Sequence, residues 1–207
     1  MAQTEQKNQN VNKQFEELQS LLERAMALQT SMVLFEWDDE TLAPKGAAEH
    51  TARVIGSLSE QYQEILASMR FKELLDACQK AEKENAGVFD EVQSAILREA
   101  AEEQERLSCI PPEEYRAYAE LTARATGIWT RAREKNDFAS FAPVLKEIIS
   151  YQKKFAAYRA KPGQKLYDVM LDTYEKGFNM EMLDPFFELM KGKIVPLLKE
   201  SAERSKR

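Results

Sequence analysis

The sequence predicts an all-α protein, and three observations support this prediction. Only 7 glycines and 7 prolines occur in 207 residues, so few positions interrupt regular structure. Runs of Val, Ile and Thr, which are typical of strands, are scarce. Alanine, leucine, glutamate, lysine and glutamine dominate instead, and these residues lose little conformational freedom on entering a helix. With 43% hydrophobic residues, the chain can bury a substantial core.

The first helix is predicted over residues 11–37. Its apolar residues recur at steps of three and four, which places them on one face: Phe15, Leu18, Leu21, Leu22, Ala25, Leu28, Met32 and Phe35. The polar segment before it, residues 1–10, is expected to be disordered. After it, Pro44 and Gly46 predict a loop over residues 38–46, because neither residue favours a continuing helix.

Seven further helices follow from the same pattern. Asn85 and Gly87 end a predicted helix pair, because both residues tolerate positive φ. Pro111 and Pro112, followed by two glutamates, mark the start of another helix. The predicted ranges are 47–69, 72–83, 89–107, 112–135, 138–159, 167–174 and 180–201. Since no repeat or linker separates them, we expect residues 11–207 to form a single elongated helical domain of about eight helices.

The charge balance excludes some classes of partner. The 29 basic residues against 35 acidic ones give a net charge of -6, which disfavours nucleic acid because phosphates need a basic surface. The first ten residues lack the apolar segment of a signal peptide, and no uncharged apolar run is long enough to span a membrane. We therefore expect a cytoplasmic protein that binds neither nucleic acid nor membrane.

Three stretches, in order along the chain, carry distinctive residue patterns. The first has Trp37, Asp38 and Thr41, then Pro44 and the run Gly46-Ala47-Ala48-Glu49. The second has Trp129, Ala132-Arg133, Asn136-Asp137-Phe138 and Phe141-Ala142-Pro143. The third has Tyr167-Asp168, Leu171-Asp172, Tyr174-Glu175, Gly177, Leu183-Asp184, Phe187 and Pro196-Leu197. In residues, order and spacing they resemble the N-terminal part of the thermostable metallocarboxypeptidases, the carboxypeptidase Taq family.

The resemblance covers nearly all of residues 15–198 and implies several properties. Members of that family are cytoplasmic, mostly helical zinc carboxypeptidases of broad specificity, and they are commonly homodimers. Their metal site is built on a His-Glu-x-x-His helix with a further glutamate. Those motifs belong to the catalytic half of the family, beyond the part that this chain resembles, so no catalytic residue is carried over. Zinc is expected only in the complete enzyme.

The residues themselves also argue against a metal site. A catalytic zinc needs three protein ligands, but His50 is the single histidine and has no second histidine four residues later. The acidic cluster Glu36, Asp38, Asp39 and Glu40 does not match a calcium loop, and we expect Asp38 or Asp39 to cap a helix or turn while the others are solvated. Cys78 and Cys109 lack CxxC spacing and are expected to be reduced thiols.

Two other sets of side chains have structural interpretations. A helix rich in glutamate, at Glu99, Glu102, Glu103 and Glu105, lacks the Glu-x-x-His pairs of di-iron bundles and is expected to be solvated. Helically spaced aromatics are expected in the core, or alternatively on a partner surface: Tyr115, Tyr118, Trp129, Phe186 and Phe187.

Two hypotheses of function follow. The first is the N-terminal helical region of a zinc metallocarboxypeptidase, which removes C-terminal residues from peptides. Under this hypothesis the chain forms a wall of the substrate groove, with Trp37, Asp38 and Thr41 as candidate groove residues. The chain then binds the catalytic half of the enzyme or a second copy in a homodimer. Alone, the chain is expected to be inactive and to expose an apolar face. The alternative is a stand-alone helical binding or assembly module without catalysis. A complete enzyme of unknown type is disfavoured by the ligand count.

Overall fold

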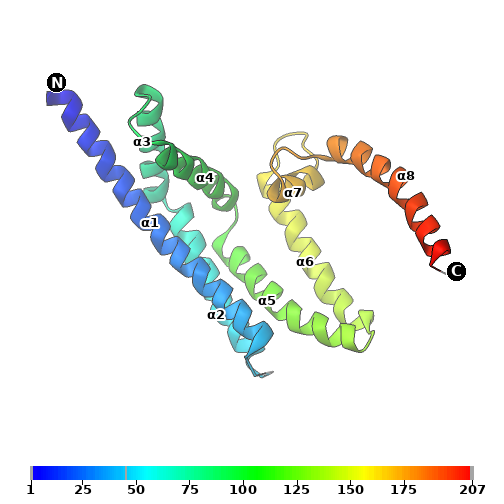
Figure 1. Cartoon of the computed structure of the whole chain (residues 1–207). Coiled ribbons are helices and arrows are strands. Elements are labelled where there is room, and N and C mark those ends of the chain that lie inside the picture. Colours follow the sequence, from blue (N-terminus) through cyan, green and yellow to red (C-terminus); the bar gives the residue numbers. More distant parts are fainter. Residues whose placement is uncertain (1, 45, 206–207) are drawn as a thin grey trace. The chain divides into compact units, whose positions relative to one another are not determined.

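The structure, a computed structural model, describes residues 2–44 and 46–205. Its helices are α1 (Ala2–Thr41), α2 (Ala48–Ala67), α3 (Met69–Glu84), α4 (Glu91–Ser108), α5 (Pro112–Glu134), α6 (Phe138–Arg159), α7 (Leu166–Tyr174) and α8 (Met180–Arg204) (Figure 1). No strand occurs in these two described ranges. The all-α prediction is confirmed, and every predicted helix has a counterpart.

The first helix is longer at both ends than the sequence pattern predicts. Residues 1–10 are predicted to be disordered, yet α1 begins at Ala2, while Met1 lies outside the described residues. This segment contains Ala, Gln, Glu and Lys without glycine or proline, so nothing in it stops a helix. At the other end, α1 continues to Thr41, and the loop predicted over residues 38–46 begins at Leu42.

The chain divides into two compact units, Met1–Tyr151 and Gln152–Arg207, whereas the sequence predicts a single domain over residues 11–207. The boundary lies inside α6, where the helical pattern runs on unbroken. No Gly, Pro or Ser cluster marks it, so linker composition gives no signal at this point. Each unit is described separately below.

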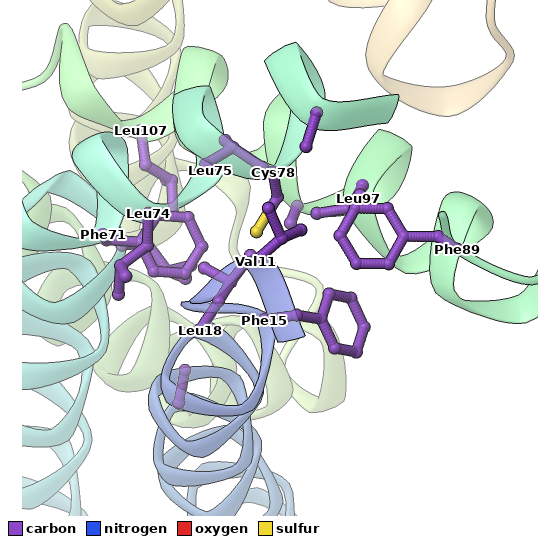
Figure 2. Packing of buried hydrophobic residues seen from close by; sticks show 14 of the residues in the cluster. Val11, Phe15, Leu18, Phe71, Leu74, Leu75, Cys78, Phe89, Leu97 and Leu107 are labelled. Carbon is purple, nitrogen blue, oxygen red and sulfur yellow. The ribbon is translucent and has the colours of Figure 1, made fainter. Parts of the chain in front are cut away.

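The first unit is built around α2, which contacts α1, α3, α4 and α5. One apolar cluster fills the space between α1, α3 and α4 (Figure 2). Val11, Phe15 and Leu18 enter it from α1, and the ring centroids of Phe15 and Phe89 lie 5.1 Å apart. Removing a large apolar side chain from water contributes about 2 kcal/mol. The members labelled in Figure 2 from the other segments are Phe71, Leu74, Leu75, Cys78, Phe89, Leu97 and Leu107.

Local hydrogen bonds set where α3 and α4 begin. The Ser68 hydroxyl oxygen accepts from the Phe71 backbone N–H at 3.1 Å, which caps α3. Asp90 and Gln93 form a capping box at α4, in which each side chain accepts from the backbone N–H of the other. Such caps satisfy N–H groups that have no partner within their own helix.

Buried polar groups connect α2 to α4 and to the segment that follows α4. Gln63 on α2 is completely buried, and its Nε2 donates to the carbonyl oxygens of Leu107, at 3.1 Å, and Ile110. The Tyr62 hydroxyl donates to Glu103 Oε1 at 3.0 Å. Glu103 was expected to be solvated with its neighbours, but it is half-buried because Tyr62 and Arg106 both bind it.

The second unit contains the end of α6, together with α7 and α8. Its buried apolar side chains are Phe155 and Ala156 of α6 and Val169 of α7. Arg159 Nη1 also donates to the Thr173 hydroxyl oxygen at 3.2 Å, which joins α6 to α7. α8 contributes no buried residue. The second unit therefore has a small core for its length.

No helix in residues 2–44 or 46–205 is long and apolar enough to cross a membrane.

Candidate functional site

The three residues predicted to face a substrate groove lie in the last turn of α1. Trp37 and Thr41 are one turn apart and therefore lie on the same side of the helix. Trp37 is 57% exposed and Thr41 is exposed, while Asp38 is half-buried on a neighbouring side. The structure thus brings Trp37 and Thr41 together on the surface. The indole does not anchor this segment in the core.

Backbone hydrogen bonds define the end of α1. The Thr41 hydroxyl donates to the Trp37 carbonyl oxygen at 2.6 Å, within the last turn of α1. The Asp38 carbonyl oxygen accepts from the N–H groups of Leu42, at 2.9 Å, and Ala43, at 2.8 Å. The expected capping by Asp38 or Asp39 is wrong. Both lie inside α1, and the N-cap residue of α2 is Ala47.

A row of exposed apolar side chains runs along α1 towards this site. It consists of Met26, Val33, Leu34 and Trp37, which we call the outer row of α1. Nearer its N-terminus, the same helix buries Phe15, Leu18 and Ala25. The outer row was missed in the sequence because the periodicity was assigned to one buried face. The spacing of Met26, Val33 and Trp37, at steps of seven and four, does place them on one side of a helix.

Glu49, in the first of the three distinctive stretches, connects the start of α2 to α5. Its Oε1 lies 3.5 Å from Arg124 Nη1 and 3.7 Å from Arg53 Nη1. These side chains are largely exposed, so each pair contributes at most about 1 kcal/mol. Glu49 therefore links the first turn of α2 to α5.

The described residues do not supply a metal site. Among them, no group of three or more His, Cys, Asp and Glu side chains lies close enough to hold a metal ion. His50 is exposed on the first turn of α2. Cys78 is buried, which raises the pKa of its thiol to about 11.

The second stretch forms the junction between α5 and α6. Asn136 adopts a left-handed conformation with φ 51°, and the N–H groups of Asn136 and Asp137 donate to the carbonyl oxygens of Arg133 and Ala132. This is the Schellman arrangement that ends a helix. The Asp137 carboxylate then accepts from the Ser140 hydroxyl and backbone N–H, and these bonds lower the pKa of Asp137. Asn136 and Asp137 thus have structural roles.

The third stretch forms the connection between α7 and α8. Asp168 Oδ1 accepts from the Met180 backbone N–H at 2.9 Å, at the start of α8. Asp172 Oδ1 accepts from the Gly177 N–H at 2.8 Å, and Gly177 has φ +79°, which favours glycine. Both carboxylates hold this turn in place.

Several aromatics expected in the core are on the surface. Trp129 is 44% exposed, and the Arg133 guanidinium lies 5.1 Å from its ring centroid. Phe186 and Phe187 of α8 are about half exposed, with ring centroids 5.4 Å apart. The core prediction is wrong for these three residues. By contrast, Tyr115 packs partly buried against the apolar cluster, and Tyr118 stacks on Tyr151 with ring centroids 5.7 Å apart.

Comparison with known proteins identifies a family. The family model described as carboxypeptidase Taq (M32) metallopeptidase matches residues 17–207. Carboxypeptidase 1 from Bacillus subtilis is 34% identical over 180 residues, which cover 87% of this chain and 35% of that protein. Thermostable carboxypeptidase 1 from Pyrococcus furiosus is 29% identical over 94% of this chain and 38% of that protein.

Solved structures agree with the sequence matches. The crystal structure of BsuCP superposes with a TM-score of 0.84 and 32% identity, over 91% of this chain and 37% of that chain. Metallocarboxypeptidase 1 from Trypanosoma cruzi gives a TM-score of 0.74 and 27% identity, over 94% of this chain and 38% of that chain. The chain spans little more than a third of the length of these relatives. On the family match over residues 17–207 and the shared fold, the chain belongs to the carboxypeptidase Taq (M32) family of metallopeptidases.

Proposed function

We propose that this chain is the amino-terminal helical part of a metallocarboxypeptidase that removes single residues from the C-termini of peptides. The observation that carries the proposal is the match of the family model to residues 17–207, supported by the 34% identity with a carboxypeptidase from Bacillus subtilis. Because the chain spans about a third of such relatives, we assign hydrolysis to the remainder of the family protein.

The metal of the complete enzyme, expected to be zinc, belongs in this proposal to that remainder. Residues 2–44 and 46–205 offer no set of ligands for it. The role of this chain is therefore to shape and support the site where the peptide binds. By itself, it is expected to be inactive.

We further propose that the end of α1 forms a wall of the substrate groove. Trp37 offers an exposed indole surface on which an extended peptide could pack, and Thr41 and Asp38 offer polar groups beside it. The side chains stand on a long helix whose inner face is buried in the core, so their positions are well supported. This placement favours a role in positioning substrate.

A chimera tests the activity. Residues 17–207 of this chain replace the corresponding part of Bacillus subtilis carboxypeptidase 1, and release of the C-terminal residue from a blocked dipeptide is measured with zinc present. We expect turnover by the chimera and none by this chain alone. A folded chimera without activity would contradict the proposal and favour a stand-alone helical binding or assembly module. Turnover by this chain alone would contradict the assignment of the metal site.

Substitution of Trp37 in the same chimera tests the groove wall. We expect Trp37→Ala to raise KM roughly tenfold with little change in kcat, as expected for loss of contacts made equally before and during reaction. Met69→Ala serves as the matched control, because Met69 is also an exposed apolar residue, at the start of α3. Equal KM values for the two variants would sink the groove assignment.

Homodimeric assembly and a cytoplasmic location, which the family resemblance implies, belong to the same proposal. Sedimentation of the chimera and fractionation of the source cells test them.

A further inference from the structure

One face of α8 carries a nearly continuous row of apolar side chains. We call it the α8 apolar face, and it consists of Met182, Leu183, Phe186, Phe187, Met190, Ile194, Leu197 and Leu198. These residues are spaced by three and four along the helix, as the buried face of an amphipathic helix requires. Even so, none of them is buried. A helix patterned for burial therefore contributes nothing to the core of the described chain.

The sequence of α8 is also weak as an isolated helix. Pro185 and Pro196 lie inside it and have no N–H to donate, and Gly192 adds backbone freedom between them. In proteins, most of the stability of a helix comes from packing of its amphipathic face rather than from helix propensity. The physical support for α8 must therefore come from packing of its apolar face.

The charges on α8 argue for a protein partner rather than a lipid surface. Helices that lie on membranes carry mainly Lys and Arg on their polar face. The polar positions of α8 have both signs in similar numbers, with Glu181, Asp184, Glu188, Glu200 and Glu203 against Lys191, Lys193, Lys199 and Arg204. Such mixed charge gives no net attraction to anionic lipid.

The extent of the family match indicates which protein covers the α8 apolar face. The match continues through α8 to residue 207, yet the relatives are more than twice as long as this chain. In those relatives, the counterpart of α8 therefore belongs to a fold with a much larger apolar interior available to it. From these observations we infer that the α8 apolar face is the docking surface for the remainder of the metallocarboxypeptidase fold, and that α8 becomes a stable helix only on docking. This inference rests on the proposed function.

Hydrogen exchange of the full chain, alone and within the chimera, tests the coupling. Alone, the amides of α8 should exchange at least about 100-fold faster than those of α2, because α2 lies at the centre of the first unit. In the chimera, the amides of α8 should slow to rates near those of α2. Equal protection of α8 and α2 in the isolated monomeric chain would overturn the inference, because it would mean that α8 needs no further partner.

Two adjacent substitutions test the face. Ile194 and Val195 are 40% and 44% exposed, but Ile194 follows Met190 by one turn on the apolar face, whereas Val195 follows Lys191 on the polar one. In the chimera, Ile194→Asp should return α8 to fast exchange, and Val195→Asp should leave its protection within about twofold of the parent. Identical behaviour of the two variants would overturn the proposed face, and Ile194→Ala provides a milder version if Ile194→Asp prevents folding.

Other occupants are distinguished by measurements on the chain alone. Concentration-dependent dimerisation that protects α8 and is abolished by Ile194→Asp would show that a second copy covers the face, against the inference. Slower exchange of the α8 amides in the presence of vesicles of equal parts phosphatidylcholine and phosphatidylglycerol would show that lipid covers the face, which would also contradict the inference. An active chimera with unprotected α8 would refute docking but leave the proposed function intact. An inactive chimera with protected α8 would support docking but contradict the proposed function.

Discussion

Gln63 shows how one buried polar side chain can join two helices and the segment that follows the second one. Its Nε2 bridges α2 to the end of α4 and to the segment before α5, while its Oε1 has no hydrogen-bond partner among the described residues. Burial of a polar side chain is unfavourable unless its hydrogen bonds offset the loss of hydration. The sequence pattern did not single out Gln63, because local periodicity cannot identify two carbonyl oxygens more than forty residues away.

Replacement of Gln63 tests this role. We expect Gln63→Ala to lower the free energy of unfolding by about 2–4 kcal/mol, because it removes the hydrogen bonds to the Leu107 and Ile110 carbonyl oxygens and opens a cavity. Urea denaturation followed by circular dichroism measures the change. Gln61→Ala, on the exposed side of the same helix, should stay within about 0.5 kcal/mol of the parent. A comparable loss in both variants would count against the buried hydrogen bonds as the cause.

The buried Tyr62 hydroxyl should make the free energy of unfolding depend on pH in the alkaline range. Burial, reinforced by the negative charge of Glu103, raises the pKa of the Tyr62 hydroxyl well above its ordinary value. A raised pKa in the folded state means that its contribution to stability is complete below the unfolded pKa, about 10, and is lost as pH rises beyond it. The free energy of unfolding should therefore fall above pH 10.

Tyr62→Phe isolates this contribution. The variant should be about 1 kcal/mol less stable at pH 8, because it loses the hydrogen bond to Glu103, but its stability should fall less steeply above pH 10. Tyr174→Phe is the control, since Tyr174 is 84% exposed and should keep the alkaline slope of the parent. Urea titrations between pH 8 and pH 11 compare the slopes, and equal slopes for the parent and Tyr62→Phe would disprove the assignment.

At the scale of elements, a close approach of α5 to α2 depends on Gly56. A Cβ added at Gly56 would clash with Cγ of Glu120, which forms an ion pair with Arg116 at 3.0 Å. Arg116 also pairs with Glu60 of α2 at 2.9 Å, so the clash would disturb the contact between the two helices. The absence of a side chain at Gly56 thus allows these helices to pack closely.

Alanine at two helical glycines should give effects of opposite sign. Gly56→Ala is expected to lower the free energy of unfolding by about 1–3 kcal/mol through overpacking. A Cβ added at Gly127, on α5, meets only the Arg131 side chain, at 3.5 Å. Gly127→Ala should therefore raise the free energy of unfolding by about 0.5–1 kcal/mol through better helix propensity. Thermal unfolding distinguishes them, and stabilisation by Gly56→Ala would refute the close approach.

The order and approximate limits of all eight elements follow from the sequence, because apolar periodicity and turn residues are local signals. Asn85 and Pro111 lie next to observed helix ends. α1 continues past its predicted end at residue 37 to Thr41, because the residues that disfavour a helix, Pro44 and Gly46, come later in the chain.

At the scale of the whole molecule, the two units differ in how much apolar surface they bury. The first has an extensive cluster contributed by α1, α2, α3 and α4, whereas the buried apolar residues of the second are Phe155, Ala156 and Val169. Local opening is easiest where few apolar contacts are lost. The second unit should therefore open first.

Limited proteolysis of the chain tests this difference. Trypsin at low concentration should cut first within residues 152–207, and a fragment that ends near residue 151 should persist. Both units contain many lysines and arginines, so the order of cleavage reports local opening. Mass spectrometry identifies the first sites, and early cleavage within α2 or α5 would contradict the expectation.

The sequence by itself determined the helical class, the order of the helices and, through three patterned stretches, the resemblance to the carboxypeptidase Taq family. These properties depend on local periodicity, helix caps and short motifs, all of which lie within a few residues of one another. Only the tertiary structure decided which apolar residues are buried. Phe186 and Leu18 look alike in a helical pattern, yet Leu18 is completely buried in the apolar cluster while Phe186 remains exposed. Burial depends on what packs against a helix face, and helical periodicity specifies the face without specifying its partner.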